Sequence, residues 1–139
     1  MNPVPLRSRF WSDLTSEEFS RLDRERLIAV LPVGATEQHG PHLPMSTDTA
    51  TIDGMVRASL PYLPDDLPVL FLPTVAYGKS NEHSGYPGTL TVSANTLISL
   101  WKDIGACVAK AGVRKLVLYN SHGGHMSVMD ILARDLREA

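Results

Sequence analysis

Residues 27–33 read LIAVLPV, and residues 34–47 directly after them read GATEQHGPHLPMST. A continuous apolar run of this length favours a strand buried on both faces, which is typical of a parallel sheet. The segment that follows is rich in Gly, Pro and His and is predicted to be a loop. Apolar residues then recur at helical spacing over residues 48–60, which predicts a helix. The stretch therefore predicts one strand–loop–helix unit.

The same unit recurs twice further along the chain. Residues 69–75 (VLFLPTV) predict a second strand, in which Pro73 indicates an end or edge position, and a helix is expected from Ser93 or Asn95 to about Ala111. Residues 115–119 (KLVLY) predict a third strand, and a helix begins near residue 127. A short helix capped by Thr15 precedes them all. This alternation predicts an α/β fold with a mainly parallel sheet and helices on its faces.

Composition narrows the class of protein. The 139 residues suit one domain, and 43% hydrophobic with 20% charged residues is the balance of a globular chain. A net charge of −2 argues against nucleic acid or an anionic membrane as partner, and the longest apolar runs are too short to cross a membrane. The single cysteine, Cys107, cannot form an internal disulfide and is expected to be buried and inert, which fits a cytoplasmic protein.

Each predicted strand runs into a loop that carries histidine. The three loops contain EQH at residues 37–39, NEH at residues 81–83 and NSHGGH at residues 120–125. The carboxyl ends of parallel strands lie on one edge of a sheet, where open α/β proteins bind their ligands. We therefore expect the three loops to form one site.

The residue types in these loops indicate a metal. Glu, His and Asp offer nitrogen and carboxylate ligands, which suit zinc or manganese. Glu37 and His39 are two apart and point the same way in extended backbone. Asp48 begins the next helix, and a carboxylate there could bridge two cations. Each feature has a simpler explanation, since Glu-x-His occurs in surface loops, Asp48 could cap its helix and His122 could be a turn residue; their joint occurrence favours a site.

Three motifs resemble those of the creatininase (creatinine amidohydrolase) family. They are VGATEQHGPHLP at residues 33–44 with STDT at 46–49, GYPGT at 85–89, and NSHGGH at 120–125. The resemblance covers the chain from about Arg9 and implies a three-layer α/β/α fold and a homo-oligomer, a hexamer in this family. It also implies a hydrolase of C–N bonds other than peptide bonds that cleaves a small cyclic amide or formamide with a metal-bound hydroxide. The family includes creatinine hydrolysis, deformylation in flavin and deazaflavin biosynthesis, and a peptidase of mycofactocin maturation.

The resemblance also assigns the metal ligands. Two divalent ions are implied, zinc and/or manganese. Glu37 and His122 would bind one ion and His39 the other, with Asp48 as the bridge. In creatininase a glutamate two residues after the histidine of the third motif completes the second metal site, and here that position is Gly124. Relatives with two glycines there take a carboxylate from a later segment.

The catalytic assignments rest on the position of two residues in the second loop. His83 and Tyr86 are predicted to act near the substrate from their place in the second loop. His125 stands where the family has asparagine, and it could be a ligand or a solvent-facing turn residue. Family chains continue well beyond residue 139, so we expect residues 1–139 to form a single creatininase-like domain that is incomplete at its C-terminus. The alternative is a short, inactive metal-binding or assembly module.

Overall fold

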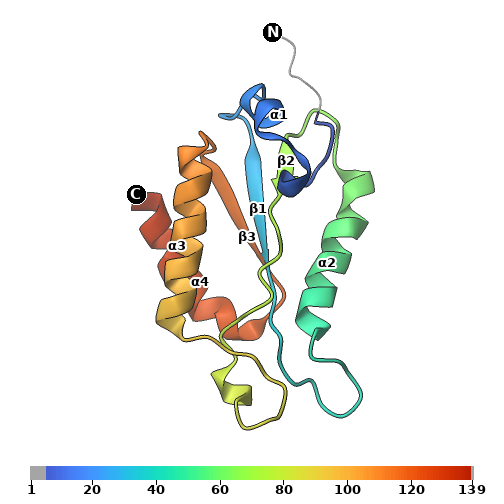
Figure 1. Ribbon diagram of the computed structural model, residues 1–139, viewed down its shortest axis with the longest axis vertical. Coiled ribbons are helices and arrows are strands. Elements are labelled where there is room, and N and C mark those ends of the chain that lie inside the picture. Colours follow the sequence, from blue (N-terminus) through green and yellow to red (C-terminus); the bar gives the residue numbers. More distant parts are fainter. Residues whose placement is uncertain (1–5, 139) are drawn as a thin grey trace.

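The computed structural model describes residues 6–138 and contains a three-stranded parallel sheet with helices on both faces (Figure 1). The strand order is β2-β1-β3, so β1 lies in the centre. The strands are β1 (Ile28–Val33), β2 (Val69–Phe71) and β3 (Lys115–Asn120). The helices are α1 (Ser16–Ser20), α2 (Thr47–Ser59), α3 (Ala94–Lys110) and α4 (Met126–Glu138). This confirms the predicted α/β class and the order of its elements.

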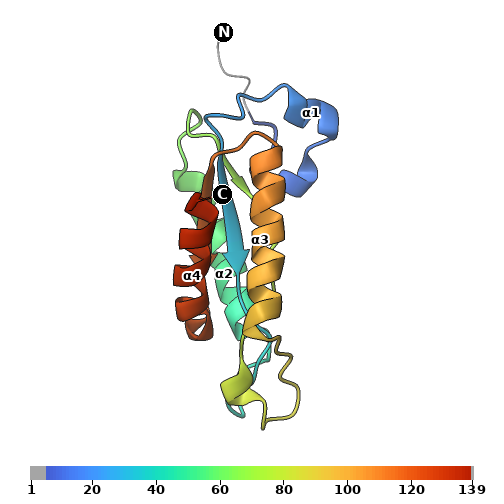
Figure 2. The same cartoon turned by 90° about the vertical axis from the view of Figure 1, so that its left-hand side faces the viewer.

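The three layers follow from the alternation of side chains along β1. Figures 1 and 2 show α2 on one side of the sheet and α3 with α4 on the other. Leu31 and its neighbours two positions away pack in the core cluster that contains Trp101 of α3 and Leu132 of α4. Val30 packs with Val56 of α2 in a second cluster. The central strand is therefore buried on both faces, as its continuous apolar sequence predicts.

The sheet edges differ from the sequence prediction at β2. The strand ends at Phe71, whereas residues 69–75 were expected, because Pro73 has no N–H to donate. Pairing resumes beyond the proline, where the Val75 N–H donates to the Pro32 carbonyl at 3.0 Å. β2 is an edge strand, as Pro73 indicated, and β3 forms the other edge, where Val117 is 46% exposed. Residues 1–5 and 139 of the expected domain lie outside the described residues.

Local signals set the helix ends. Thr15 and Glu18 form the expected capping box of α1, and Ser93 caps α3 by accepting from the Thr96 N–H at 3.1 Å. Gly112, with φ of 90°, ends α3 in a conformation that favours glycine. The prediction of a buried Cys107 was wrong, because this residue lies on the exposed side of α3. Within residues 6–138, no helix combines the length and the apolar character needed to cross a membrane.

Candidate metal centre

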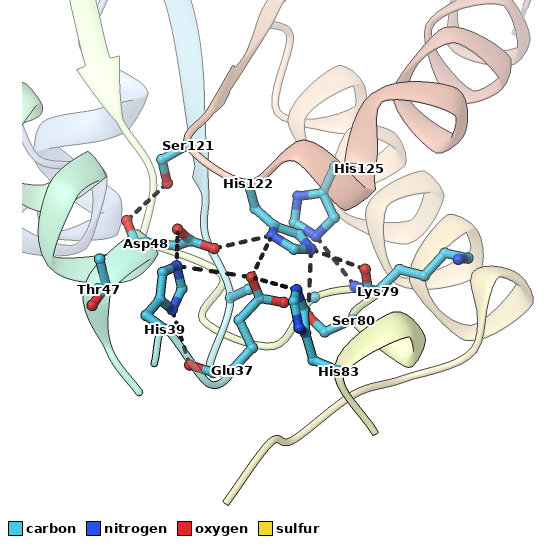
Figure 3. Close-up of polar contacts among 12 residues, drawn as sticks. Glu37, His39, Thr47, Asp48, Lys79, Ser80, His83, Ser121, His122 and His125 are labelled. Atoms are coloured by element: carbon cyan, nitrogen blue, oxygen red, sulfur yellow. Dashed lines mark hydrogen bonds and ion pairs between the residues drawn. The ribbon is translucent and has the colours of Figure 1, made fainter. Parts of the chain in front are cut away.

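The three histidine-bearing loops meet at the carboxyl edge of the sheet, at the lower end of the molecule in Figure 1. Glu37 and His39 follow β1, and Asp48 lies in the first turn of α2. His83 ends the 3₁₀ turn η3 (Asn81–His83), and His122 follows β3. Figure 3 shows that their side chains point toward one another. The convergence predicted from parallel strand topology is therefore present.

Asp48 lies between two histidines. Its Oδ1 is 3.1 Å from His39 Nε2, and its Oδ2 is 3.0 Å from His122 Nδ1. Glu37 Oε1 lies 3.3 Å from His122 Nδ1, 3.9 Å from His39 Nε2 and 3.7 Å from His83 Nε2. Because each Asp48 oxygen faces a different imidazole, this carboxylate has the arrangement that a bridge between two cations requires.

Backbone carbonyls fix which nitrogen of each imidazole faces the carboxylates. His39 Nδ1 lies 3.0 Å from the Glu37 carbonyl oxygen, and His122 Nε2 lies 2.9 Å from that of Lys79. A carbonyl only accepts, so in the neutral rings these nitrogens carry the proton. The other nitrogens, His39 Nε2 and His122 Nδ1, then present lone pairs to the carboxylates. Metal-binding histidines are oriented in this way in many proteins.

Two carboxylate oxygens of the cluster lack hydrogen bonds. Glu37 and Asp48 are 4% and 8% exposed, and within residues 6–138 neither Glu37 Oε2 nor Asp48 Oδ2 has a hydrogen-bond partner. Buried charged oxygens are costly unless they are paired or coordinate a metal. One donor atom each from Glu37, His39 and Asp48 lies within 4.8 Å of the other two. The residues therefore fit a divalent cation.

The simpler role of Asp48 as a helix cap finds no support in the geometry. Ser46 occupies the N-cap of α2 and makes no side-chain capping hydrogen bond. The Asp48 side chain turns instead toward His39 and His122, while its backbone carbonyl accepts from Ser121 Oγ at 2.8 Å. This last bond ties the third loop to the start of α2.

Electrostatics at His39 favour positive charge. Burial lowers its pKa, but the hydrogen bond to the Glu37 carbonyl and the charges of Asp48 and Glu37 outweigh burial, so the pKa is raised above the ordinary value. The cluster thus attracts a cation to the position that His39 Nε2 faces. A proton and a metal ion compete for that position.

His125 is neither a ligand nor a solvent-facing turn residue, in contrast to both expectations. It is fully buried, and its ring stands edge-on against Trp101 at a centroid distance of 5.0 Å. Nδ1 donates to Asn120 Oδ1 at 2.9 Å, and Nε2 accepts from the Lys79 N–H at 3.3 Å. Both ring nitrogens are therefore occupied, and His125 holds the second loop beside His122.

This environment predicts a pH-dependent stability. Burial, together with the nearby His122, lowers the pKa of His125 to about 3. In the unfolded chain the pKa of this histidine has its ordinary value near 6.5, so below that pH it is protonated there but not in the folded chain. His125 therefore lowers the free energy of unfolding as the pH falls from 6.5 toward 3. When the pH is lowered from 7 to 5.5, the free energy of unfolding of the metal-free chain should fall by roughly 1 kcal/mol more than that of the His125→Phe variant. Urea unfolding at both pH values measures this, and equal losses would contradict it.

Gln38 determines the tautomer of His83. The Gly40 N–H donates to Gln38 Oε1 at 2.9 Å, so the amide nitrogen faces His83 Nδ1, at 2.6 Å. An amide NH₂ only donates, so Nδ1 accepts and the ring proton of neutral His83 is on Nε2, the atom that faces Glu37. His83 thus presents a proton to the centre. Tyr86 is 57% exposed, with its ring centroid 6.5 Å from that of His83.

Two contributors were missed by sequence reasoning. Gln38 was quoted in the first motif and given no role. Glu82 was quoted in its loop and given no role, yet one donor atom each from Glu37, Glu82 and His122 lies within 4.8 Å of the other two. The only signal for Glu82 in the sequence is a carboxylate adjacent to His83 in a loop of the site.

The fold and the cluster define an α/β protein with a candidate divalent-metal centre at the carboxyl edge of a parallel sheet. The chain belongs to the creatininase family, whose family model, described as creatinine amidohydrolase, matches residues 12–139. This confirms the resemblance inferred from the three motifs.

Individual relatives agree with this assignment. A mycofactocin precursor peptide peptidase from Mycobacterium tuberculosis is 37% identical over 123 residues, which cover 84% of this chain and 49% of the relative. A creatinine amidohydrolase from Pseudomonas putida is 33% identical, covering 96% of this chain and 54% of the relative. The chain spans about half the length of these curated relatives.

Solved structures give the same result for the fold. One described as "Creatininase Mn" is 30% identical and superposes with a TM-score of 0.76, covering 95% of this chain and 54% of that chain. A mutant creatininase described as "Zn-Zn type" is 31% identical with a TM-score of 0.73, covering 96% of this chain and 54% of that chain. The creatininase-like α/β fold is therefore established for this chain.

Proposed function

We propose that this chain carries the metal centre of a hydrolase that cleaves an amide C–N bond. Glu37, His39, Asp48 and His122 would hold two divalent ions, with Asp48 between them. The observation that carries the proposal is the position of Asp48, whose two oxygens face ring nitrogens of two different histidines, His39 Nε2 at 3.1 Å and His122 Nδ1 at 3.0 Å. When bound, divalent ions supply Lewis acidity and an activated water.

Residues of the chain itself would orient the metal ligands and contact the substrate. The carbonyls of Glu37 and Lys79 hold the imidazoles of His39 and His122 in orientation before any ion arrives. Such preorganisation avoids rearrangement at the moment of reaction. His83 is 30% exposed at its side chain and carries its proton on Nε2, so it can donate a hydrogen bond to the carbonyl oxygen of an amide as negative charge develops there. Tyr86 remains a predicted substrate contact.

The proposed substrate is a small amide, such as a cyclic amide or a formamide. Support comes from the Pseudomonas putida relative, which is a creatinine amidohydrolase. The Mycobacterium tuberculosis relative is a peptide peptidase, so a peptide bond is the competing substrate. Zinc and manganese both suit the mixed nitrogen and oxygen ligands. A homo-oligomer, hexameric by the same resemblance, remains a prediction.

Metal analysis combined with a hydrolysis screen tests the proposal. The chain would be stripped with a chelator, reloaded with zinc or manganese, and assayed against creatinine, formamides and short peptides. We expect two ions per chain and metal-dependent turnover of at least one class. Stoichiometric metal without turnover would favour the alternative of an inactive binding or assembly module. No bound metal would overturn both.

His83→Ala tests the proposed hydrogen-bond donor. The variant should keep its metal content and lose about 10²-fold to 10³-fold in kcat, because one hydrogen-bond donor to a developing oxyanion contributes on that scale. His42→Ala is the matched control, since His42 is an exposed histidine of the first loop. Loss of metal in His83→Ala would make His83 a ligand instead, and an unchanged kcat would remove it from the reaction.

A further inference from the structure

Glu82 lies next to the proposed centre without having been assigned to it. It sits in the 3₁₀ turn η3, directly before His83. One donor atom each from Glu37, Glu82 and His122 lies within 4.8 Å of the other two. Ligand atoms around one zinc or manganese ion, each at about 2.0–2.2 Å from it, have separations in this range. Glu37 and His122 therefore have a third potential ligand beside them.

The backbone at Gly124 makes room for this carboxylate. A Cβ atom at Gly124 would lie 2.9 Å from Glu82 Oε1 and 2.4 Å from the Lys79 carbonyl oxygen. Any side chain at this position would collide with the second loop where it meets the third. The glycine thus allows η3 and its Glu82 to approach His122.

An independent observation points to a cation at the same place. Glu37, nine-tenths buried, has an oxygen, Oε2, with no hydrogen-bond partner within residues 6–138. The ion pairs of Glu37 in the described part of the chain are all to histidines. The ammonium group of Lys79, in the same loop, donates a hydrogen bond to Asn81 Oδ1. The cluster therefore contains negative charge from Glu37, Asp48 and Glu82 that two divalent ions would neutralise.

We propose that Glu82 is a third carboxylate ligand of the metal centre and binds the cation that Glu37 and His122 hold. This inference rests on the proposed function, because it assumes that the centre takes divalent ions. It adds that the second loop supplies a ligand as well as the hydrogen-bond donor His83. Ion binding would then fix η3, so that loading the centre also positions His83.

Glu82→Gln tests this assignment through metal binding rather than turnover. Gln keeps the size of the side chain and removes its charge, and Glu82 is exposed, so folding should be preserved and circular dichroism would check it. Manganese titration followed by the electron paramagnetic resonance signal of free Mn²⁺ reports both sites. We expect two sites in the original chain, and in the variant a Kd of one site at least tenfold weaker. Even outer-shell groups contribute about 10-fold to 100-fold to metal affinity.

Glu25→Gln provides the matched control, because it makes the same chemical change at an exposed glutamate just before β1, at the opposite end of that strand from the site. It should bind manganese as the original chain does. Two unchanged sites in Glu82→Gln would overturn the role of Glu82 and leave the proposed function intact. Equal weakening of both sites would also contradict the assignment to one cation. If the original chain binds no manganese or zinc, the proposed function itself fails.

Discussion

Asp48→Asn is expected to release both cations and to lower kcat by at least about 10⁴-fold. Asp48 is the residue that faces both His39 and His122, so its loss affects the two ions together. The expected loss combines Lewis-acid stabilisation worth several kcal/mol with the activation of water, and each 1.4 kcal/mol is about tenfold in rate. Elemental analysis and the hydrolysis assay measure the two effects on one preparation.

The chain offers a close control for this change. Asp53 lies on the same helix, α2, and accepts a hydrogen bond from Thr74 Oγ1 at 2.6 Å, which an asparagine oxygen can also accept. Asp53→Asn should retain metal and activity. A folded Asp48→Asn variant that keeps two ions and full turnover would remove Asp48 from the centre. Loss of both properties in Asp53→Asn would show that any charge change on α2 is disruptive.

Trp101→Ala is expected to cost about 3–5 kcal/mol of unfolding free energy, the usual range for removing a buried tryptophan. Trp101 is fully buried in the core between the sheet and α3, and it supports His125 edge-on. Domains of this size are stable by only about 5–15 kcal/mol, so the loss is a large fraction of the total. The site should suffer as well, because His125 positions the loop that carries Lys79.

Trp101→Phe separates packing from the indole N–H. Trp101 Nε1 is buried and has no hydrogen-bond partner within residues 6–138, so replacing the indole breaks no hydrogen bond there. The phenyl ring keeps much of the contact with His125, and we expect a loss well below that of the alanine variant. Urea unfolding of the three proteins at pH 7 makes the comparison. If the Phe and Ala variants lost the same free energy of unfolding, packing of an aromatic ring at this position would not be what stabilises the region.

The sequence was sufficient for the architecture because β1 carries a strong signal. Its apolar run is continuous, as burial on both faces requires, and the loop after it is marked by glycine, proline and histidine. Once three such strands are parallel, their loops must share one edge. The proximity of Glu37, His39, Asp48, His83 and His122 follows from that topology.

The errors arose where a side chain depends on its exact position. Cys107 was expected in the core, but the buried positions of α3 are Leu97, Trp101, Gly105 and Val108, and Cys107 lies outside this stripe. His125, which stands where the family has asparagine, was expected at the surface or on a metal. The turn η4 (Gly123–His125) instead directs it onto Trp101. No periodicity in the sequence reports such a turn.

Contacts between loops were also beyond sequence reasoning. Glu82 lies near Glu37 and His122, where Gly124 leaves space for it, and this depends on how two loops far apart in sequence meet. The role of Gln38 depends in the same way on the Gly40 N–H and His83 Nδ1, which together fix the direction of its amide.

Anomalous X-ray diffraction from crystals of this chain grown with manganese would test the central proposal most directly. Two peaks about 3.5–4 Å apart are expected, as in other two-metal sites, with Asp48 contacting both and with His39 and His122 on different ions. Absence of density among these side chains, with manganese bound elsewhere or not at all, would contradict the proposal that these loops exist to bind a pair of cations.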